Sequence, residues 1–526
     1  MGAEPLSRTA EAPRLRRTLT LWDLIFYGIV LIQPVAPMGI FGVVSQQARG
    51  HVITTILIGM VAMLLTALSY GRMARAYPSA GSAFTYVGQE LHPGLGYVTG
   101  WSMVMDYVLN PMICTILCSK LAMNYLPGTP YPAWVVFFAA LFTGMNLRGI
   151  KQSARTAEIL TVAMSVVVVL FLGASLRTIL GMHLGGGDFV RPFYDPSTFS
   201  LGLVLTGTSI ACLTYIGFDG ISTLSEEVEN PRRNILLATV LVCLITGVLA
   251  TLEVYAAQLV WGDWKGYPDV DTAFVHVAGK AGGPFLFAVL NATLLVANIG
   301  SGAGAHLGAA RLLYGMGRSG ALPPRFFGSI DPRRNIPRNN VILVGVLALI
   351  GGLVLSYQLG AEMLNFGASI AFMGVNLASL MHYGVRGRDR RWHDFVLPLL
   401  GFLICLGLWL KLNWPAKVFG GAWLVVGVLH ESPDRVGIAQ MCQTLPLLLF
   451  LLFGGLLAVR VELRRLLLLL HAAAACAGPA LAALAFAQRV GFETLLVYAL
   501  GWGTIQAFVS PARDAMVSHL GLRDLM

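Results

Sequence analysis

Long apolar runs recur along the chain from Leu19 almost to the C-terminus, and short polar segments separate them. Each run is about 18 to 25 residues long, which is the length that an α-helix needs to cross the hydrocarbon core of a bilayer. The pattern therefore predicts an all-α polytopic membrane protein. Up to residue 430 it predicts helices near residues 20–46, 52–74, 94–125, 131–148, 155–180, 200–227, 235–261, 284–315, 339–358, 361–384, 394–412 and 414–430.

The first predicted helix is interrupted at its centre. Gln33, Pro34 and Pro37 fall inside the otherwise apolar run from Gly28 to Gly39. A proline removes a backbone donor and clashes with the carbonyl four residues earlier, and hydrocarbon offers no partner for the backbone groups that this frees. We therefore expect the helix to break there and its backbone groups to face a protein-lined cavity.

The sixth predicted helix repeats this irregularity. Gly217, Asp219 and Gly220 interrupt its apolar run, and an aspartate at mid-membrane depth is costly unless it has a partner or a function. Interrupted helices at positions one and six, each opening a set of five, predict a transporter of two inverted five-helix repeats with its site near the midplane. The alternative is that both are ordinary kinks packed against neighbouring helices.

Composition and charge agree with a membrane transporter. Of the 526 residues, 56% are hydrophobic and 12% charged, and mean hydropathy is +0.71, whereas soluble proteins carry about 25% charged residues. The net charge of +10 comes from basic residues in alternate loops, which predicts a cytoplasmic N-terminus and no nucleic-acid partner. The Arg-rich first twenty residues do not resemble a cleavable signal peptide.

No catalytic, metal or cofactor signature is found in the sequence. The seven cysteines lie in or beside apolar segments without metal-site spacing, and there is neither a nucleotide-binding loop nor a zinc-type histidine pair. We therefore expect no enzyme activity, no cofactor and no metal.

Several motifs occur together in a fixed order. They are Tyr77–Tyr86, Gly100–Ser102 with Asp106–Tyr107, Gly217–Asp219 with Leu224–Glu227, and Ser301–Gly302 through His306 to Arg311–Tyr314 and Met316–Arg318. From about Thr18 to Leu429 the chain resembles the amino acid–polyamine–organocation (APC) permeases, and within that family it is most similar to bacterial putrescine importers.

The resemblance implies ten helices in two inverted repeats plus two peripheral helices. It also implies that substrate binds between the broken helices one and six and helices three, eight and ten, and that transport is by alternating access and proton-coupled. Many amino-acid permeases of this group carry a Gly-Ser-Gly-like turn in the first helix, whose amides meet the substrate carboxylate. The segment Ile32–Pro37 replaces that turn here, which favours a cationic amine. The alternative is an amino-acid importer or an amino acid/polyamine exchanger.

A diamine such as putrescine needs a carboxylate or carbonyl at each end, because an ammonium group stripped of water must be paired again. Asp106 and Asp219 are the acidic residues deep in helices three and six, and we expect them to bind the ammonium groups. The alternative for Asp219 is that it only caps the unwound backbone, and the alternative for Asp106 is a purely structural role. The other candidates surround the substrate. Tyr107, Tyr215 and Phe218 would form an aromatic wall with cation–π contacts. Ile32, Gln33 and Ala36 would contribute backbone carbonyls, and Gly217 would permit the unwinding.

Four other ionisable residues are gating or coupling candidates. Glu226 and Glu227 lie beside Arg232 and Arg233, where they form switchable ion pairs of an inner gate or are simply solvated. Glu253 in helix seven and His306 in helix eight are candidate proton relays, and the alternative for His306 is a packing role.

The sequence predicts three parts: a cytoplasmic tail over 1–17, the permease domain over 18–430, and a fragment with about three transmembrane helices over 431–526. Within the last part, Gly454–Arg465 and Ser510–Ala515 resemble segments of a major facilitator superfamily exporter, with Val459 where that family's signature has an aspartate. We expect this fragment to be dispensable for transport. The expected partners are a small amine or amino acid and membrane lipid, and the sequence does not predict an oligomeric state.

Overall fold

The computed structural model describes residues 19–428 apart from gaps at 79–81, 149–153, 226, 319–322, 332–333, 335 and 388–390, with short helical pieces between 468 and 509. The predicted N-terminal tail over 1–17, nearly all of the predicted fragment over 431–526 and the gating candidate Glu226 therefore lie outside the described residues. The candidate site lies in one compact unit, Met1–Leu312 with Ile330–Leu424.

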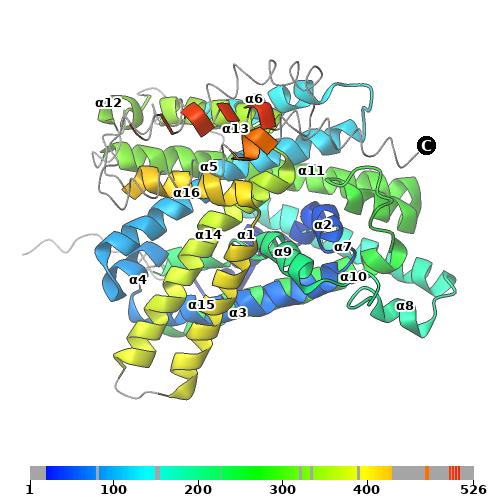
Figure 1. Cartoon of the computed structure of the whole chain (residues 1–526), viewed down its shortest axis with the longest axis horizontal. Helices are drawn as coiled ribbons and strands as arrows, with labels where there is room; N and C mark the ends of the chain where they lie inside the picture. Colours follow the sequence, from blue (N-terminus) through cyan, green and yellow to red (C-terminus); the bar gives the residue numbers. More distant parts are fainter. Residues whose placement is uncertain are drawn as a thin grey trace, which may run out of the picture. The chain divides into compact units, whose positions relative to one another are not determined.

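All of the long elements are helices (Figure 1). The first span is a bent pair, α1 (Leu21–Ile32) and α2 (Ala36–Gln47), with 45° between its halves. The other elements up to the sixth span are α3 (Val52–Ala76), α4 (Ser82–Glu90), α5 (Pro93–Met123), α6 (Tyr131–Leu147), α7 (Ala154–Gly181), α8 (Gly186–Val190) and α9 (Leu201–Ala211), which continues into the 3-10 segments η1 (Cys212–Tyr215) and η2 (Phe218–Leu224).

The second half of the described chain begins at α10. It comprises α10 (Pro231–Val260), α11 (Ala273–Arg318), α12 (Pro324–Phe327), α13 (Arg338–Val354), α14 (Tyr357–Ser379) with its π-helical end η3 (Leu380–Val385), α15 (Trp392–Lys411) and α16 (Trp414–Val428). Every predicted helix up to residue 430 has a counterpart. Within the described part of the chain, eight helices are long and apolar enough to cross a membrane, and the bent pair adds a ninth span.

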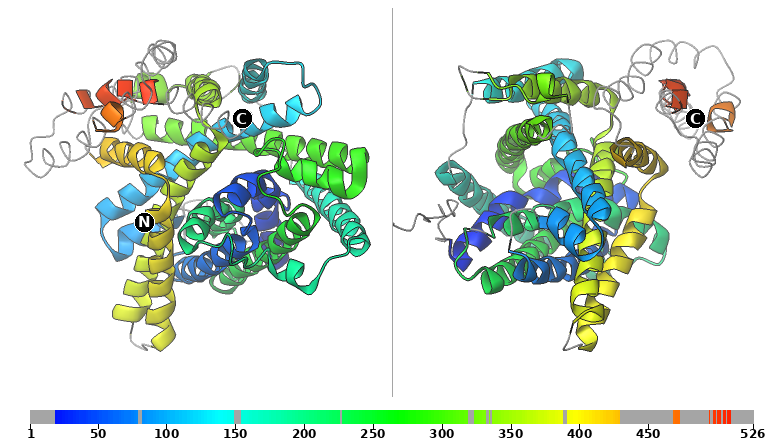
Figure 2. Two further views of the ribbon diagram at one scale, coloured as in Figure 1. Left: turned by 45° about the vertical axis from the view of Figure 1, so that its right-hand side comes forward. Right: turned by 90° about the vertical axis from the view of Figure 1, so that its left-hand side faces the viewer.

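The helices around the two breaks pack together. The α10 helix packs along α3 and also contacts α1, while α9 contacts α2 and α3. A second group is formed by α5, α6 and α13, which contact one another. The α14 and α15 helices run side by side in every view (Figures 1 and 2).

One predicted boundary differs from the structure. The helix expected over 284–315 is preceded by a further helical arm that begins at Ala273. The arm and the main helix are separated by Gly282 and Gly283, where the backbone of Gly283 has φ 70°, and the main helix restarts at Pro284. The short arm lies below the roughly 19-residue window over which hydropathy identifies a span.

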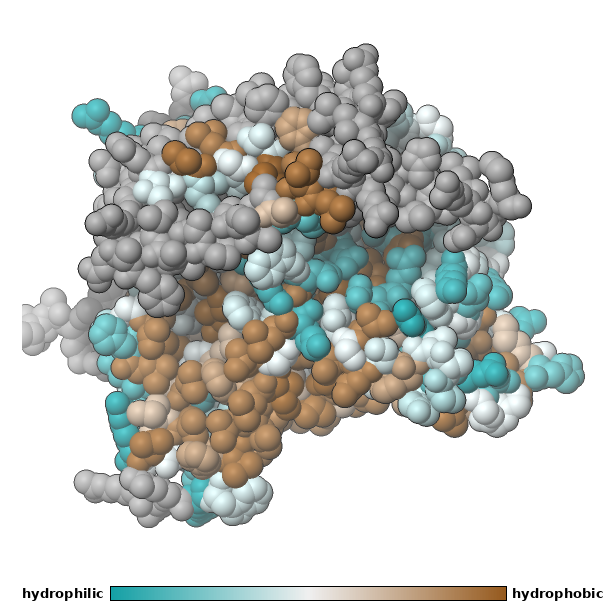
Figure 3. All heavy atoms as spheres, in the orientation of Figure 1, coloured by the Kyte–Doolittle hydropathy of each residue, from teal (hydrophilic) through white to brown (hydrophobic). Residues whose placement is uncertain are grey.

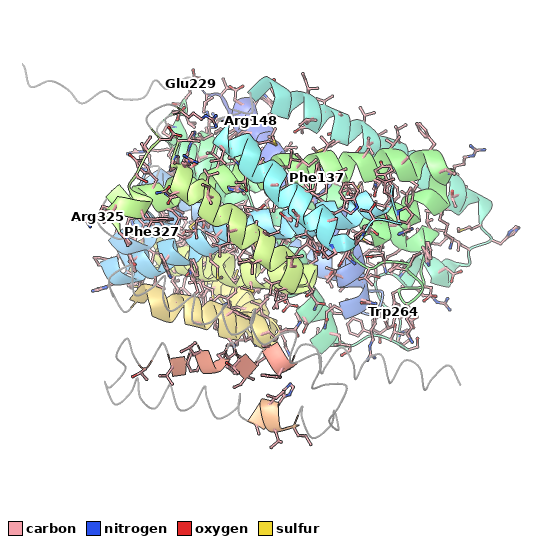
Figure 4. All side chains as sticks on the ribbon, turned by 90° about the horizontal axis from the view of Figure 1, so that it is seen from above. Phe137, Arg148, Glu229, Trp264, Arg325 and Phe327 are labelled. Carbon is pink, nitrogen blue, oxygen red and sulfur yellow. The ribbon has the colours of Figure 1, made fainter. Side chains whose placement is uncertain are left out.

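Successive loops lie at alternate ends of the helices. Arg148, at the end of α6, and Glu229, before α10, lie toward one end of the molecule, and Trp264, after α10, lies at the other (Figure 4). The outward face of α15 exposes Phe395, Leu403 and other large apolar side chains (Figure 3). A contiguous apolar exterior of this kind is suited to lipid rather than water.

Candidate substrate site

The two interrupted spans touch at their breaks, through glycine. Gly217 has φ 126°, and a Cβ placed on it would lie 3.3 Å from the carbonyl carbon of Leu31 and 3.4 Å from the backbone nitrogen of Ile32. A Cβ on Gly28 would lie 2.7 Å from the side chain of Ile221. Glycine therefore permits both the backbone conformation and the close approach of α1 to η2.

Asp219 holds the unwound backbone of the sixth span. Its Oδ1 accepts a hydrogen bond of 3.2 Å from the Gly217 amide, and the carboxylate also interacts with the amide of Gly220. Asp219 therefore caps the break, which is the alternative role expected of it from the sequence. A carboxylate has about four acceptor positions, and this one is only partly buried, so capping leaves room for a ligand cation.

Asp106 lies on α5 and interacts electrostatically with Asp219. Within the described residues neither carboxyl group has a basic ion-pair partner. Two carboxylates that share a partly desolvated site cannot both be charged without a neighbouring cation or proton. The structure thus brings the two predicted acidic residues together.

Two tyrosines lie beside this pair. Tyr107 is 43% exposed and interacts electrostatically with both Asp106 and Asp219, and its ring lies against Gly308 of α11. Tyr27 of α1 is 37% exposed and interacts with Asp219. Sequence reasoning missed Tyr27, which lies on α1 next to Gly28 in the apolar run before the break.

The other two predicted aromatic residues pack in the interior of the protein. Tyr215 is fully buried and donates a hydrogen bond of 2.8 Å to the Ile56 carbonyl of α3. Phe218 is also fully buried, with its ring centroid 5.6 Å from that of Tyr70 and 5.5 Å from that of Phe372. Both rings pack in the hydrophobic core around the sixth span.

The break in the first span is held by its own backbone and by α11. The Gln33 amide donates to the Ile29 carbonyl, and the Ala36 amide donates to the Gln33 carbonyl. Gln33 has φ 68°, a strained conformation for a residue other than glycine, and its side chain donates a 3.3 Å hydrogen bond to the Ala297 carbonyl. Ile32 is buried beside this turn. The break therefore offers few free amides, and Pro34 has none.

Of the gating candidates, Glu227 belongs to a backbone bridge between the start of the first span and the end of the sixth. Its carbonyl accepts from the Leu19 amide at 3.1 Å, and the Glu229 amide donates to the Leu19 carbonyl at 2.9 Å. This parallel bridge joins Leu19, two residues before α1, to Val228 in the segment after η2. A movement of either broken span at this end would therefore pull on the other.

The two candidate proton relays have different surroundings. The His306 ring nitrogen Nε2 lies 2.8 Å from the Val341 carbonyl, which links α11 to α13, while Nδ1 has no partner within the described residues. Glu253 is fully buried in α10, and neither of its carboxyl oxygens has a hydrogen-bond partner there. Neither residue lies in the Asp106–Asp219 cluster.

Comparison with known proteins agrees with this geometry. The family model described as "Amino acid permease" matches residues 24–468, a match that runs past residue 430, where we predicted the permease domain to end. The low-affinity putrescine importer PlaP of Escherichia coli (strain K12) is 34% identical over 428 residues, which cover 79% of this chain and 93% of the importer.

More distant relatives have other substrates in their names. The branched-chain amino acid permease BcaP of Lactococcus lactis subsp. cremoris is 25% identical, covering 78% of this chain and 93% of that permease. The methylthioribose transporter of Bacillus subtilis (strain 168) is 26% identical, covering 81% of this chain and 95% of that transporter. The chain therefore belongs to the amino acid permease family of the APC group: it is an integral inner-membrane transporter for amino acids or polyamines and not an enzyme.

Proposed function

We propose that this chain imports a putrescine-like diamine by alternating access, coupled to protons, with its N-terminus in the cytoplasm. The observation that carries the proposal is the pair Asp106 and Asp219, which interact with each other at the helix breaks and lack a basic partner within the described residues. The putrescine importer that is 34% identical to this chain supports the same substrate class.

A diamine fits the charge of this site. At an effective dielectric constant of about 20, two unit charges about 4 Å apart interact by about 4 kcal/mol, so an ammonium group beside each carboxylate replaces repulsion by attraction. The partly exposed rings of Tyr27 and Tyr107 offer faces for cation–π contact with the same groups. The methylene chain between the two ammonium groups requires only an apolar or aromatic wall.

The breaks are less suited to an α-amino acid. A substrate carboxylate needs free backbone amides or a cation, but the Asp219 carboxylate already occupies the Gly217 amide. In the first span the amides of Gln33 and Ala36 bond to backbone carbonyls. A second carboxylate at this place would face Asp219 directly.

The runner-up is an amino-acid importer or an amino acid/polyamine exchanger. The observation that favours it is the set of relatives whose names include branched-chain and cationic amino acids. Such a substrate would have to place its carboxylate away from Asp219.

The geometry also supports the proposed route. The breaks in α1–α2 and in the sixth span meet at Gly217, so that substrate at this point is reached from either side when the spans tilt. The bridge between Leu19 and Val228, with Glu227 beside it, would be the inner gate. Basic residues at this end, such as Arg148 and Arg232, favour a cytoplasmic position for the gate.

Uptake of labelled putrescine into proteoliposomes, with unlabelled competitors, tests the proposal. We expect diamines to compete strongly, a monoamine of the same chain length weakly, and leucine or alanine not at all. We expect an imposed inward proton gradient to stimulate the uptake. Stronger competition by arginine or leucine than by any diamine would favour the runner-up and contradict the proposal.

A further inference from the structure

Four acidic side chains are buried within the described residues, and three of them are fully partnered. Glu90 accepts from Tyr77 and pairs with His382 at 2.5 Å and Arg386 at 3.2 Å. Asp394 pairs with Arg72 and accepts from the Arg391 amide. The third, Glu362, accepts from Gln358 at 2.9 Å and from the side chain and backbone of Asn413 at 2.6 and 3.1 Å.

Glu253 is the exception. It has no exposed surface, and neither Oε1 nor Oε2 has a hydrogen-bond partner in the described part of the chain. It lies seven residues before the end of α10, among buried apolar neighbours on the same helix such as Ala250, Val254 and Ala257. An ionised carboxylate without a partner is not stable in such surroundings, whereas the protonated form only has to forgo its hydrogen bonds.

No nearby charge changes this conclusion. Glu253 takes part in none of the ion pairs found within the described residues. The elements packed against α10 are α1, α2, α3, α7, η1 and η2. Among the side chains that the structure describes on these elements, the charged and phenolic ones are Asp23 and Tyr27 on α1, Tyr70, Arg72 and Arg75 on α3, Glu158 and Arg177 on α7, Tyr215 on η1 and Asp219 on η2.

The helix that carries Glu253 is in contact with both broken spans. A Cβ on Gly28 of α1 would lie 2.8 Å from Val242 of α10. A Cβ on Gly247 of α10 would lie 3.2 Å from the ring of Tyr215 in the sixth span. A change in the position of α10 is therefore transmitted directly to the spans that form the substrate site.

We propose that Glu253 is the site of the transported proton: it is protonated in the conformation described here and releases the proton when movement of the broken spans admits water to α10. One proton then binds the carboxylate from one side of the membrane and leaves to the other in each cycle. The claim that proton release is coupled to substrate movement rests on the proposed diamine import. The claim that Glu253 is protonated in this conformation does not.

Infrared difference spectroscopy of the purified transporter tests the proton directly. A protonated carboxyl group gives a carbonyl stretching band that a carboxylate lacks. We expect the wild type at neutral pH to have a component of this band that Glu253→Gln lacks and that Glu362→Gln retains, because Glu362 is buried but fully partnered. An unchanged band in Glu253→Gln would overturn the assignment even if putrescine is not the substrate.

Transport tests the coupling. Glu253→Gln mimics the protonated form and is nearly isosteric, so we expect it to fold and to exchange labelled for unlabelled putrescine across the membrane at equal pH. We expect it to lose all stimulation of net uptake by an imposed proton gradient, while Glu362→Gln keeps it. Full stimulation in Glu253→Gln would refute the coupling.

Discussion

Gly217→Ala addresses the contact between the two breaks. At φ 126° an alanine would be in a conformation that side chains rarely adopt, and its Cβ would lie 3.2 Å from the Ile32 side chain and 3.3 Å from the Leu31 carbonyl carbon. Backbone strain of this kind costs about 1–3 kcal/mol, and the tight contacts with backbone atoms of α1 leave little room for relief. We therefore expect the folded protein to lose about 2 kcal/mol, a factor of about 30 in the unfolding equilibrium.

The assay is thermal inactivation of the detergent-solubilised protein, followed by the loss of monodisperse material on a size-exclusion column. Gly144→Ala is the matched control, because Gly144 lies within α6 and a Cβ there would meet no atom within 4 Å. Alanine at such a helical position adds about 0.5–1 kcal/mol of stability. The reasoning is refuted if Gly217→Ala inactivates at the same temperature as Gly144→Ala or at a higher one.

Three further predictions concern separate parts of the chain. Asp106→Asn removes one of the two proposed ammonium partners, worth about 1.5–3 kcal/mol, so competition assays should show putrescine affinity falling by about tenfold or more and monoamine affinity falling less. Glu90→Gln leaves His382 and half-exposed Arg386 without their carboxylate and should lower stability by about 2 kcal/mol, measured by thermal inactivation. The hydrogen bond to Glu90 raises the pKa of Tyr77 to about 12, so Tyr77 remains a donor to Glu90 throughout the physiological pH range. Deletion of residues 431–526 should leave putrescine uptake nearly intact; a large loss in a deletion variant that reaches the membrane would contradict the predicted domain boundary.

Much of the architecture could be predicted because its determinants are local. Pro34 and Gln33 break the first span, and Gly217 and Asp219 break the sixth, by backbone effects that depend on adjacent residues alone. The order and approximate bounds of the spans follow from apolar runs long enough to cross a bilayer. The same reasoning located both acidic residues of the candidate site.

Contacts between distant segments could not be predicted. Trp101 and Trp423 stack with their centroids 4.8 Å apart, and each indole donates to the other residue's carbonyl, across 322 positions. Likewise, Glu362 is partnered by Asn413 and Glu253 by no described residue, although both are glutamates in apolar helices. Which side chains meet depends on how the helices rotate and pack, and hydropathy does not contain that information.

For the same reason the sequence could not show which of the predicted aromatic residues face the candidate site and which pack in the core. Tyr107 lies beside the carboxylates, but Phe218, directly before Asp219 in the chain, points into the core against Tyr70 and Phe372. Neighbours in an irregular 3-10 segment face different directions, and a regular helical period does not predict which.

The central claim is that Asp219, together with Asp106, binds the ammonium groups of a diamine at the meeting point of the two breaks. Equilibrium binding of labelled putrescine to the purified wild type and to Asp219→Asn tests it most directly, because it requires neither coupling nor a complete transport cycle. Asparagine keeps an acceptor for the Gly217 amide but removes the charge, so the account predicts a folded variant that binds putrescine at least about tenfold more weakly. Wild-type affinity in Asp219→Asn would contradict the account.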